Sequence, residues 1–279
     1  MYDQVQKLGK SLIHHGPNND RAYLMKLDDS DRLTIIDQLY QLCLLKRYSK
    51  IIAKVPEPYV GKFMESNFKV EAAIPGFYNG KTTGYFLGRY FSLARSRFST
   101  TDRAKVRQIR EAARAPFDPL SVHLLSGYQI RPLGPGHVVA LAELYKKVFS
   151  VYPFPVFDPA YLMSTIEEGS VHYFGVFKNK QLVAASSAEV DRQAGNAEMT
   201  DFATHPDHTG MKLSVLLLRQ MESVMREKGI QTLYTIARAK SPGMNKTFHR
   251  LGYTYGGILI QNTRIGSSIE HMNVWYKPV

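Results

Sequence analysis

The 279-residue chain is predicted to adopt an α/β fold of the α+β kind. Three observations favour it. Short apolar strand patterns alternate with helical patterns along nearly the whole chain. Asn179 and Lys180 separate two strand patterns, 171–177 and 182–190, by a tight turn of the kind that closes an antiparallel hairpin. The order of strands and helices in the first part of the chain recurs in the last part, which indicates an internal repeat.

The first 92 residues contain both helix and strand patterns. A helix is predicted over 31–45, where apolar residues share one stripe at helical spacing, and a second helix over 56–66. The predicted strands lie at 21–27, 50–55, 68–74 and 85–91. A basic, polar segment that contains Pro116 and Pro119 follows, and it is predicted to connect two units.

The part of the chain from residue 127 onward has more elements. Its longest helix is predicted over 211–228 and ends at Gly229, a residue type favoured just after a helix. Other helices are expected at 137–149, 159–168 and 242–251. Besides the hairpin, strands are expected at 128–131, 197–204, 233–237, 253–261 and 272–276.

The two parts align with each other. When "SKIIAK…KFMESNF" is laid on "LYTIAR…KTFHRLGY", Phe63 falls on Phe248 and Asn67 on Gly252. Asn and Gly both tolerate the left-handed conformation found after a helix end. We therefore predict a partial, degenerate half-domain at 1–92, a basic connector at 93–126 and a complete unit at 127–279. Only the second copy is expected to have the N-terminal strands that complete the unit. The alternative is two generic α/β segments.

Composition restricts the class of protein. The net charge of +12 favours an anionic partner. Part of the excess lies between Arg95 and Arg114, which is interpreted as a solvated linker helix; the alternative is a phosphate-facing patch. No zinc-finger spacing or aromatic RNA-binding motif accompanies these cations, so no nucleic-acid partner is expected.

Membrane, disulfide and metal chemistry are not expected. No apolar run reaches the roughly 18 residues of a membrane span, and the N-terminus lacks a signal peptide's apolar core, so a cytoplasmic location is expected. Cys43 is the single cysteine and lies in an apolar helical pattern, which predicts a buried thiol. His205 and His208 flank Pro206 on a loop without a third ligand, so no metal site is predicted.

A phosphate site is predicted in the second unit only. Its strand-to-helix loop, 204–212, contains Gly210 and Lys212, whereas the matching loop of the first unit, 27–31, contains three aspartates. A helix N-terminus offers free N–H groups to a phosphate. Aspartates would cap that helix themselves and repel a polyphosphate, while glycine and lysine would favour one.

This loop and the strands around it resemble the GNAT acetyltransferase superfamily, whose fold is a mixed, mostly antiparallel sheet flanked by helices. The resemblance implies that acetyl-CoA is the co-substrate, bound by the strand end, the loop and the last helix: Phe202, Ala203, Thr204, Thr209, Gly210, Met211, Lys212, Leu213, Ser214 and Asn245. Thr209, Lys212 and Ser214 depart from the usual loop pattern. Phe248 stands where many members have a tyrosine that protonates the leaving thiolate.

Almost the whole chain resembles the β-lysine N-acetyltransferases of bacteria and archaea. The stretches that carry the resemblance are "DRAYLMKL", "AKVP", "IPGFYNG", "TDFAT", "YTIARA…GMN" and "NVWYKP". The resemblance implies transfer of an acetyl group from acetyl-CoA to the terminal amine of β-lysine, which yields the compatible solute acetyl-β-lysine. It also implies a lysine aminomutase as supplier of β-lysine. A homodimer is a possible state of assembly.

An attacking amine must lose a proton, since an amine of this kind has a pKa near about 10.4 in water. The proton acceptor is either a nearby carboxylate or a water chain held by one. Asp201 and Glu198 are the candidates, expected on opposite faces of their strand because their separation is odd. Asp201 is nearer the reacting end and is the preferred base. Its alternatives are an ion pair with Arg238 and recognition of the substrate's second ammonium.

Polar residues that could hold the substrate are predicted at Asn262, Thr263, Glu270 and Asn273 on the last two strands, and at Tyr78 in the first unit. Polar residues there could equally cap a hairpin. The altered loop and Phe248 support a different class of protein, a non-catalytic acyl-CoA-binding sensor. A third hypothesis keeps a GNAT enzyme but makes the acceptor another small amine or a peptide amine.

Overall fold

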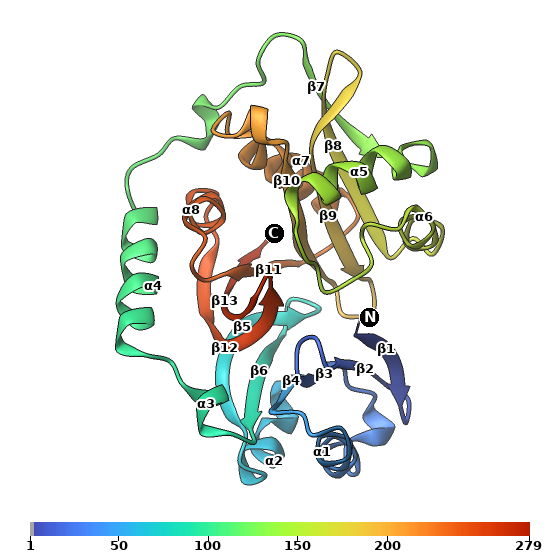
Figure 1. Ribbon diagram of the computed structural model, residues 1–279, viewed down its shortest axis with the longest axis vertical. Coiled ribbons are helices and arrows are strands. Elements are labelled where there is room, and N and C mark those ends of the chain that lie inside the picture. The colour runs from blue at the N-terminus through green and yellow to red at the C-terminus, as the bar shows by residue number, and fades with distance from the viewer. Residues whose placement is uncertain (1–2) are drawn as a thin grey trace.

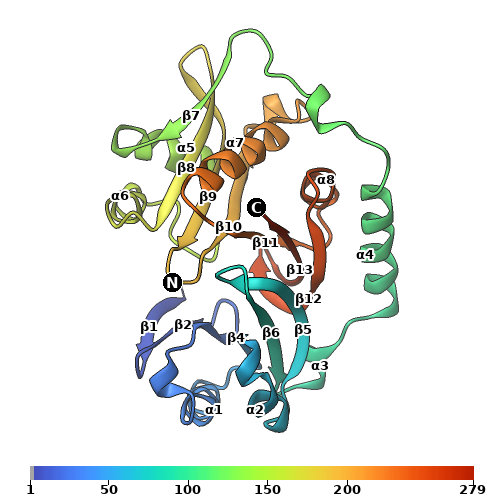
Figure 2. The ribbon, with the colours of Figure 1, turned by 180° about the vertical axis from the view of Figure 1, so that it is seen from behind.

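The computed structural model describes residues 3–279, and in that range 13 strands form one continuous sheet with helices on its faces (Figure 1). The strand order is β1-β2-β3-β4-β6-β5-β12-β13-β11-β10-β9-β8-β7. The N-terminal half of the chain therefore forms one end of the sheet and the C-terminal half forms the other, as both views show (Figures 1 and 2). None of the helices in the described range is long and apolar enough to cross a membrane.

The N-terminal half combines six strands with two helices. The strands are β1 (Gln4–Leu8), β2 (Ser11–Gly16), β3 (Arg21–Lys26), β4 (Lys50–Pro56), β5 (Lys69–Tyr78) and β6 (Thr82–Tyr90). The helices are α1 (Ile35–Lys46) and α2 (Val60–Glu65). Helix α1 buries Ile36, Leu39 and Cys43 of the predicted apolar stripe, which confirms the buried thiol. Leu33, which was also expected on the stripe, lies before the helix and is exposed, because the helix begins later than predicted.

The C-terminal half has seven strands in the described chain and four helices. The strands are β7 (Tyr128–Leu133), β8 (Val171–Lys178), β9 (Gln181–Asp191), β10 (Asn196–Thr204), β11 (Thr232–Arg238), β12 (Thr254–Ile265) and β13 (Ser268–Pro278). The helices are α5 (Val138–Val148), α6 (Pro159–Glu167), α7 (Leu213–Glu227) and α8 (Pro242–Arg250). Helices α5 and α6 cover one face of the sheet and α7 the other (Figures 1 and 2).

The turn between β8 and β9 is the predicted hairpin. Asn179 and Lys180 both have positive φ, 49° and 68°, and the two strands pair antiparallel. Positive φ at both central residues is the condition for the turn type that matches the right-handed twist of paired strands.

The two halves share fine details of backbone structure. After α2, the N–H of Phe68 donates to Phe63 O at 3.1 Å, with Asn67 at φ 62°. After α8, the N–H of Tyr253 donates to Phe248 O at 3.1 Å, with Gly252 at φ 83°. Both helices therefore end in the left-handed cap that the alignment predicted.

Irregularities in strand pairing also recur. The β5–β6 pairing shifts between Ile74 and Tyr78, and the β12–β13 pairing shifts between Leu259 and Thr263. These positions coincide when Phe63 is aligned with Phe248. A bulge is a defined local feature rather than random noise, so its recurrence favours a true repeat over two generic segments.

The expectation that the first copy lacks N-terminal strands is wrong. Strands β1 and β2 form an antiparallel hairpin that leads into β3, as β8 and β9 lead into β10. Most residues of β1 are exposed, and β2 contains two histidines, so neither has the apolar alternation by which a strand is recognised. Counterparts of β7, α5 and α6 are absent from the described part of the N-terminal half.

The halves join where β5 pairs with β12. Gly257 is the Cα partner of Ala72, and an apolar cluster that includes Phe77, Phe86 and Tyr234 lies over the junction. Polar contacts reinforce it, since Asn79 N donates to Ala194 O at 2.7 Å and Thr232 Oγ1 donates to Gly76 O at 2.7 Å. The sheet is therefore continuous through the centre of the molecule.

Replacing Gly257 with Ala is expected to destabilise the fold by about 3 kcal/mol, the sum of crowding and backbone strain. An added Cβ would lie 2.3 Å from Glu71 O, and Gly257 has φ 146°. Denaturant unfolding would measure the loss. Gly243→Ala is the control, because a Cβ at that site on α8 meets nothing within 4 Å. Equal midpoints for the two variants would contradict the expected crowding.

The connector contains the predicted linker helix. Residues Thr100–Ala113 form α4, preceded by a single turn, α3 (Leu93–Ser96). Helix α4 lies beside α8 along the outside of the molecule (Figures 1 and 2). It buries Val106, Ile109 and Ala113, while most of its basic residues remain exposed.

Candidate active site

The parallel strands β10 and β11 separate part-way along their length. Their pairing in the described chain runs from Asn196–Thr232 to Glu198–Tyr234 and then stops. Strand β10 contains a bulge against β9 between Thr200 and Ala203, and Asp201 in the bulge has φ 55°. Bulges commonly re-aim a side chain beside an active site.

This bulge changes the side on which Asp201 lies, so the expectation that Asp201 and Glu198 lie on opposite faces is wrong. Asp201 accepts hydrogen bonds from Ser187 and from Tyr152, in the loop between α5 and α6. Ser187 and Glu189 on β9 are the direct partners of Thr200 and Glu198 on β10. One extra residue in a strand moves the following side chain to the other face, and three carboxyls, 189, 198 and 201, therefore share the face covered by α5 and α6.

Burial is the main influence on all three carboxyls and raises the pKa of each. The charges of Glu198 and Asp201 raise the pKa of Glu189 further, and that of Asp201 does the same for Glu198. Hydrogen bonds from Ser187 and Tyr152 oppose the increase at Asp201. A carboxylate whose pKa is raised is a stronger base when ionised, which suits it to accept a proton from an amine.

The N-terminal half contributes a cation to this cluster. Burial lowers the pKa of Lys54, on β4. The charges of Glu198 and Glu189 are close enough to oppose this decrease. The Nζ of Lys54 is 3.3 Å from Tyr234 Oη and lies over the rings of Tyr234 and Phe77. Within residues 3–279, no carboxylate approaches Nζ to ion-pair distance. The ammonium is therefore held among acids without being paired to one of them.

The start of α7 remains open, as the loop sequence predicted. Gly210 has φ 85° with open space where a side chain would be, and Lys212 occupies the N-cap with φ 58° and makes no side-chain cap bond. In the N-terminal half, Asp28 caps Ser30 N and Asp31 accepts from the N–H groups of Lys10 and Ser11. No side chain caps the start of α7, so its N–H groups are available to an anion, whereas aspartates occupy the matching loop of the N-terminal half.

Comparison with known proteins identifies the family of this chain. The model of the acetyltransferase (GNAT) family matches residues 138–253. A β-lysine N(6)-acetyltransferase from Methanococcus maripaludis is 33% identical over 277 residues, which cover 99% of this chain and 98% of that protein. The chain belongs to the β-lysine N-acetyltransferase family of GNAT enzymes.

Two further relatives agree with this membership. The N-acetyltransferase YodP from Bacillus subtilis is 35% identical over 221 residues, 79% of this chain and 78% of that protein. A β-lysine N(6)-acetyltransferase from Methanosarcina mazei is 38% identical over 152 residues, 54% of this chain and 56% of that protein. The chain is accordingly an N-acetyltransferase with the α/β GNAT fold that the sequence predicted.

The predicted cofactor residues of this GNAT enzyme lie in two groups. Phe202 lies in the bulge of β10 and is followed by Ala203 and Thr204, and residues 209–214 surround the start of α7. Asn245 is separate from both groups. Its side chain donates to Arg238 O and Ser241 O and accepts from Asn273 and Trp275, so its amide is fully engaged within the protein.

The predicted substrate residues do not come together. Tyr78 lies beside Tyr23, near the carboxyl cluster. Asn262 and Thr263 instead accept hydrogen bonds from Arg21 in the N-terminal half. Glu270 pairs with Arg238 at 2.6 Å, an arrangement that removes Arg238 as the proposed partner of Asp201.

Phe248 is buried and packs edge-on against Phe202, with ring centroids 5.7 Å apart. A phenylalanine has no hydroxyl with which to protonate the leaving thiolate. Sequence reasoning missed Glu189, Ser187, Tyr152 and Lys54. The β9–β10 register could have revealed Glu189, because a residue opposite Glu198 shares its face. Ser187, Tyr152 and Lys54 could be identified only once the bulge in β10 and the junction between the halves were known.

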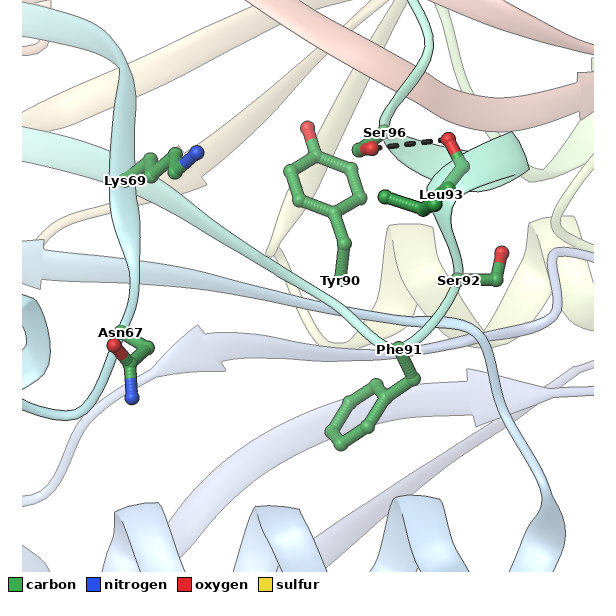
Figure 3. A pocket seen from close by; sticks show the side chains of 7 residues that line it. All are labelled: Asn67, Lys69, Tyr90, Phe91, Ser92, Leu93 and Ser96. Atoms are coloured by element: carbon green, nitrogen blue, oxygen red, sulfur yellow. Dashed lines mark hydrogen bonds between the residues drawn. The ribbon is translucent and has the colours of Figure 1, made fainter.

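Two surface pockets lie away from this cluster. One, of about 330 Å³, lies beside α3 and is lined by Asn67, Lys69, Tyr90, Phe91, Ser92, Leu93 and Ser96 (Figure 3). The other, of about 290 Å³, lies behind α7, where Glu222 pairs with Lys277 at 2.7 Å. Neither is lined by the three carboxyls, so the candidate active site is identified from the chemistry of its side chains and not from a pocket.

Proposed function

We propose that this enzyme transfers an acetyl group from acetyl-CoA to the terminal amine of β-lysine. The observation that supports this acceptor is the charge pattern of the cluster: Glu189, Glu198 and Asp201 beside one ammonium, that of Lys54. β-Lysine has the complementary pattern, two ammonium groups and one carboxylate. The relatives named for β-lysine acetylation support the same acceptor.

In the proposed reaction, Asp201 takes a proton from the terminal ammonium, and the neutral nitrogen attacks the thioester carbonyl. A new C–N bond forms and the C–S bond breaks; the nitrogen loses its second proton as the amide forms, and a proton passes to the departing thiolate, which leaves as the thiol of CoA. Glu189 and Glu198 hold the second ammonium, and Lys54 holds the carboxylate. Phe202–Thr204 would supply an N–H donor to the carbonyl oxygen, and the open start of α7 would hold the diphosphate of acetyl-CoA.

The corresponding division of the chain is also proposed: a catalytic domain at 127–279, a connector at 93–126 and a degenerate repeat at 1–92. We do not assign a second catalytic unit to the repeat, for two reasons. Its parallel strands β3 and β4 stay paired as far as Leu24–Ala53 and do not separate as early as β10 and β11 do. Aspartates also occupy its strand-to-helix loop, where a phosphate would bind. Its role is to supply Lys54, Tyr23 and Tyr78 to the neighbouring site.

Release of free thiol from acetyl-CoA by the purified protein tests the proposal, with β-lysine, α-lysine, a polyamine and a peptide amine as acceptors. The expected result is the highest kcat/KM with β-lysine, the acceptor for which the relatives are named; the polyamine has no carboxylate to pair with Lys54. Faster turnover with the polyamine or peptide would assign another acceptor. Acetyl-CoA binding without thiol release from any acceptor would support the sensor hypothesis instead.

A further inference from the structure

We propose that the connector completes the acetyl-CoA site: Arg114 of the connector and Arg250 of α8, which Phe117 positions, bind the 3′-phosphate of the CoA adenosine. This inference rests on the proposed use of acetyl-CoA. The basic composition of the connector left open that it contains a phosphate-facing patch, and the inference names the phosphate that this patch would bind.

The connector is fixed against the catalytic half after α4 ends. Arg219 Nη1 on α7 donates to the carbonyl oxygens of Pro119 and Val122, each at 3.1 Å. Val122 is buried, and Phe117 packs partly buried against the core around α7. Both views show the connector passing from the side of α8 to α7 (Figures 1 and 2). Phe117 therefore occupies a defined place between these two helices.

Cations gather on this ring without an anion. The guanidinium carbon of Arg250 lies 4.2 Å from the centroid of Phe117, and Lys212 Nζ lies 5.4 Å from it. Arg114 lies at the C-terminal end of α4, which packs beside α8. Burial lowers the pKa of His249, next to Arg250, and the nearby charge of Arg114 lowers it further. Among residues 3–279, no carboxylate forms an ion pair with Arg114, Lys212 or Arg250. Like charges that converge in this way repel each other unless an anion binds between them.

Arg250 has a hydrogen-bonding group that the protein leaves unused. Its Nε is enclosed and has no hydrogen-bond partner in the described chain. A buried donor without a partner is destabilising, so a donor kept in this state indicates a missing acceptor. Stacking on Phe117 holds the planar guanidinium in one orientation, and a planar guanidinium binds phosphate in a bidentate manner.

The position fits one part of CoA. Lys212 is both a member of this patch and the N-cap of α7, where the diphosphate is proposed to bind. Beyond its diphosphate, CoA carries one more anionic group, the 3′-phosphate of its ribose. A ligand held at α7 by its diphosphate would therefore present a second phosphate beside the patch formed by Phe117, Arg114, Lys212 and Arg250.

Binding of CoA and of 3′-dephospho-CoA, measured by isothermal calorimetry, tests the inference without depending on turnover. The wild-type protein is expected to bind CoA about 10-fold more tightly than 3′-dephospho-CoA, because the second ligand lacks one charge-assisted hydrogen-bonded contact. Arg250→Gln is expected to weaken CoA binding about 10-fold and to abolish the difference between the two ligands. Phe117→Leu should reduce that difference, since the guanidinium loses its support.

Arg107→Gln is the matched control, because Arg107 is 77% exposed on α4 and approaches only Glu111. It should discriminate between the ligands as the wild type does. Equal binding of CoA and 3′-dephospho-CoA by the wild type would overturn the inference, as would an Arg250→Gln variant that weakens both ligands equally. Thermal melting of each variant separates loss of contact from loss of fold. Absence of acetyl transfer in the thiol assay would reject the proposed reaction alone.

Discussion

Asp201→Asn is expected to lower kcat about 10²–10⁴-fold, the usual contribution of a general base. Asparagine keeps the shape of the side chain and can still accept a hydrogen bond from Ser187 or Tyr152, but it cannot take a proton from the substrate ammonium. Steady-state thiol release with β-lysine would measure the loss. The change should appear in kcat more than in KM, because a lost base affects the transition state and not substrate binding.

The pH profile distinguishes this role from a structural one. Burial raises the pKa of Asp201, so kcat/KM of the wild type should fall as the pH drops through that raised pKa, where the base becomes protonated. The variant should lose this acidic limb. Ser187→Ala removes a hydrogen bond that stabilises the carboxylate, so it should move the limb to higher pH and leave substantial activity. An Asp201→Asn variant with unchanged kcat would transfer the role of base to Glu189, a buried neighbour with a raised pKa.

Lys54→Met is expected to raise KM for β-lysine about 10- to 100-fold, the effect of removing a charge-assisted contact with the substrate carboxylate. Methionine keeps most of the apolar stem that packs near Phe77 and Tyr234. For 1,5-diaminopentane, which has two ammonium groups and no carboxylate, KM should stay unchanged or fall. A reversal of preference between these two acceptors would identify Lys54 as a specificity residue.

Lys26→Met is the control for this experiment. Lys26 is on the neighbouring strand β3, is half-exposed, and pairs with Asp191 at 3.2 Å across the same boundary between the halves. Its loss should weaken the boundary slightly, because exposed ion pairs contribute about 0–1 kcal/mol, and should leave the preference between the acceptors intact. If Lys54→Met raised KM equally for both acceptors, the ammonium would be structural and not a carboxylate binder.

Much of the fold could be predicted from the sequence because its strong signals are local. Apolar stripes predicted α1 and α7, and the paired turn residues Asn179 and Lys180 predicted the β8–β9 hairpin. Strands β1 and β2 were missed because β1 is an exposed edge strand without apolar alternation. The alignment of Asn67 with Gly252 predicted a shared helix cap, since the left-handed backbone restricts residue choice directly.

The candidate site was harder to predict because it depends on non-local geometry. Counting along β10 placed Glu198 and Asp201 on opposite faces, and one bulge residue reversed that result. Aspartate tolerates a left-handed conformation in many loops, so Asp201 gives no local warning of a bulge. Lys54 is 144 positions from Glu198 along the printed sequence, and only the β5–β12 junction brings the two strands into one sheet.

The continuity of the sheet through that junction also affects behaviour in dilute solution. Lys54 and the carboxyls of β9 and β10 belong to one polypeptide, so their encounter is intramolecular. An active site divided between separate subunits is lost by mass action when the protein concentration falls below the dissociation constant. Here a covalent link holds the cation near the acids at a fixed effective concentration. The charge pattern proposed to bind the substrate is therefore complete in each single molecule, however few copies are present.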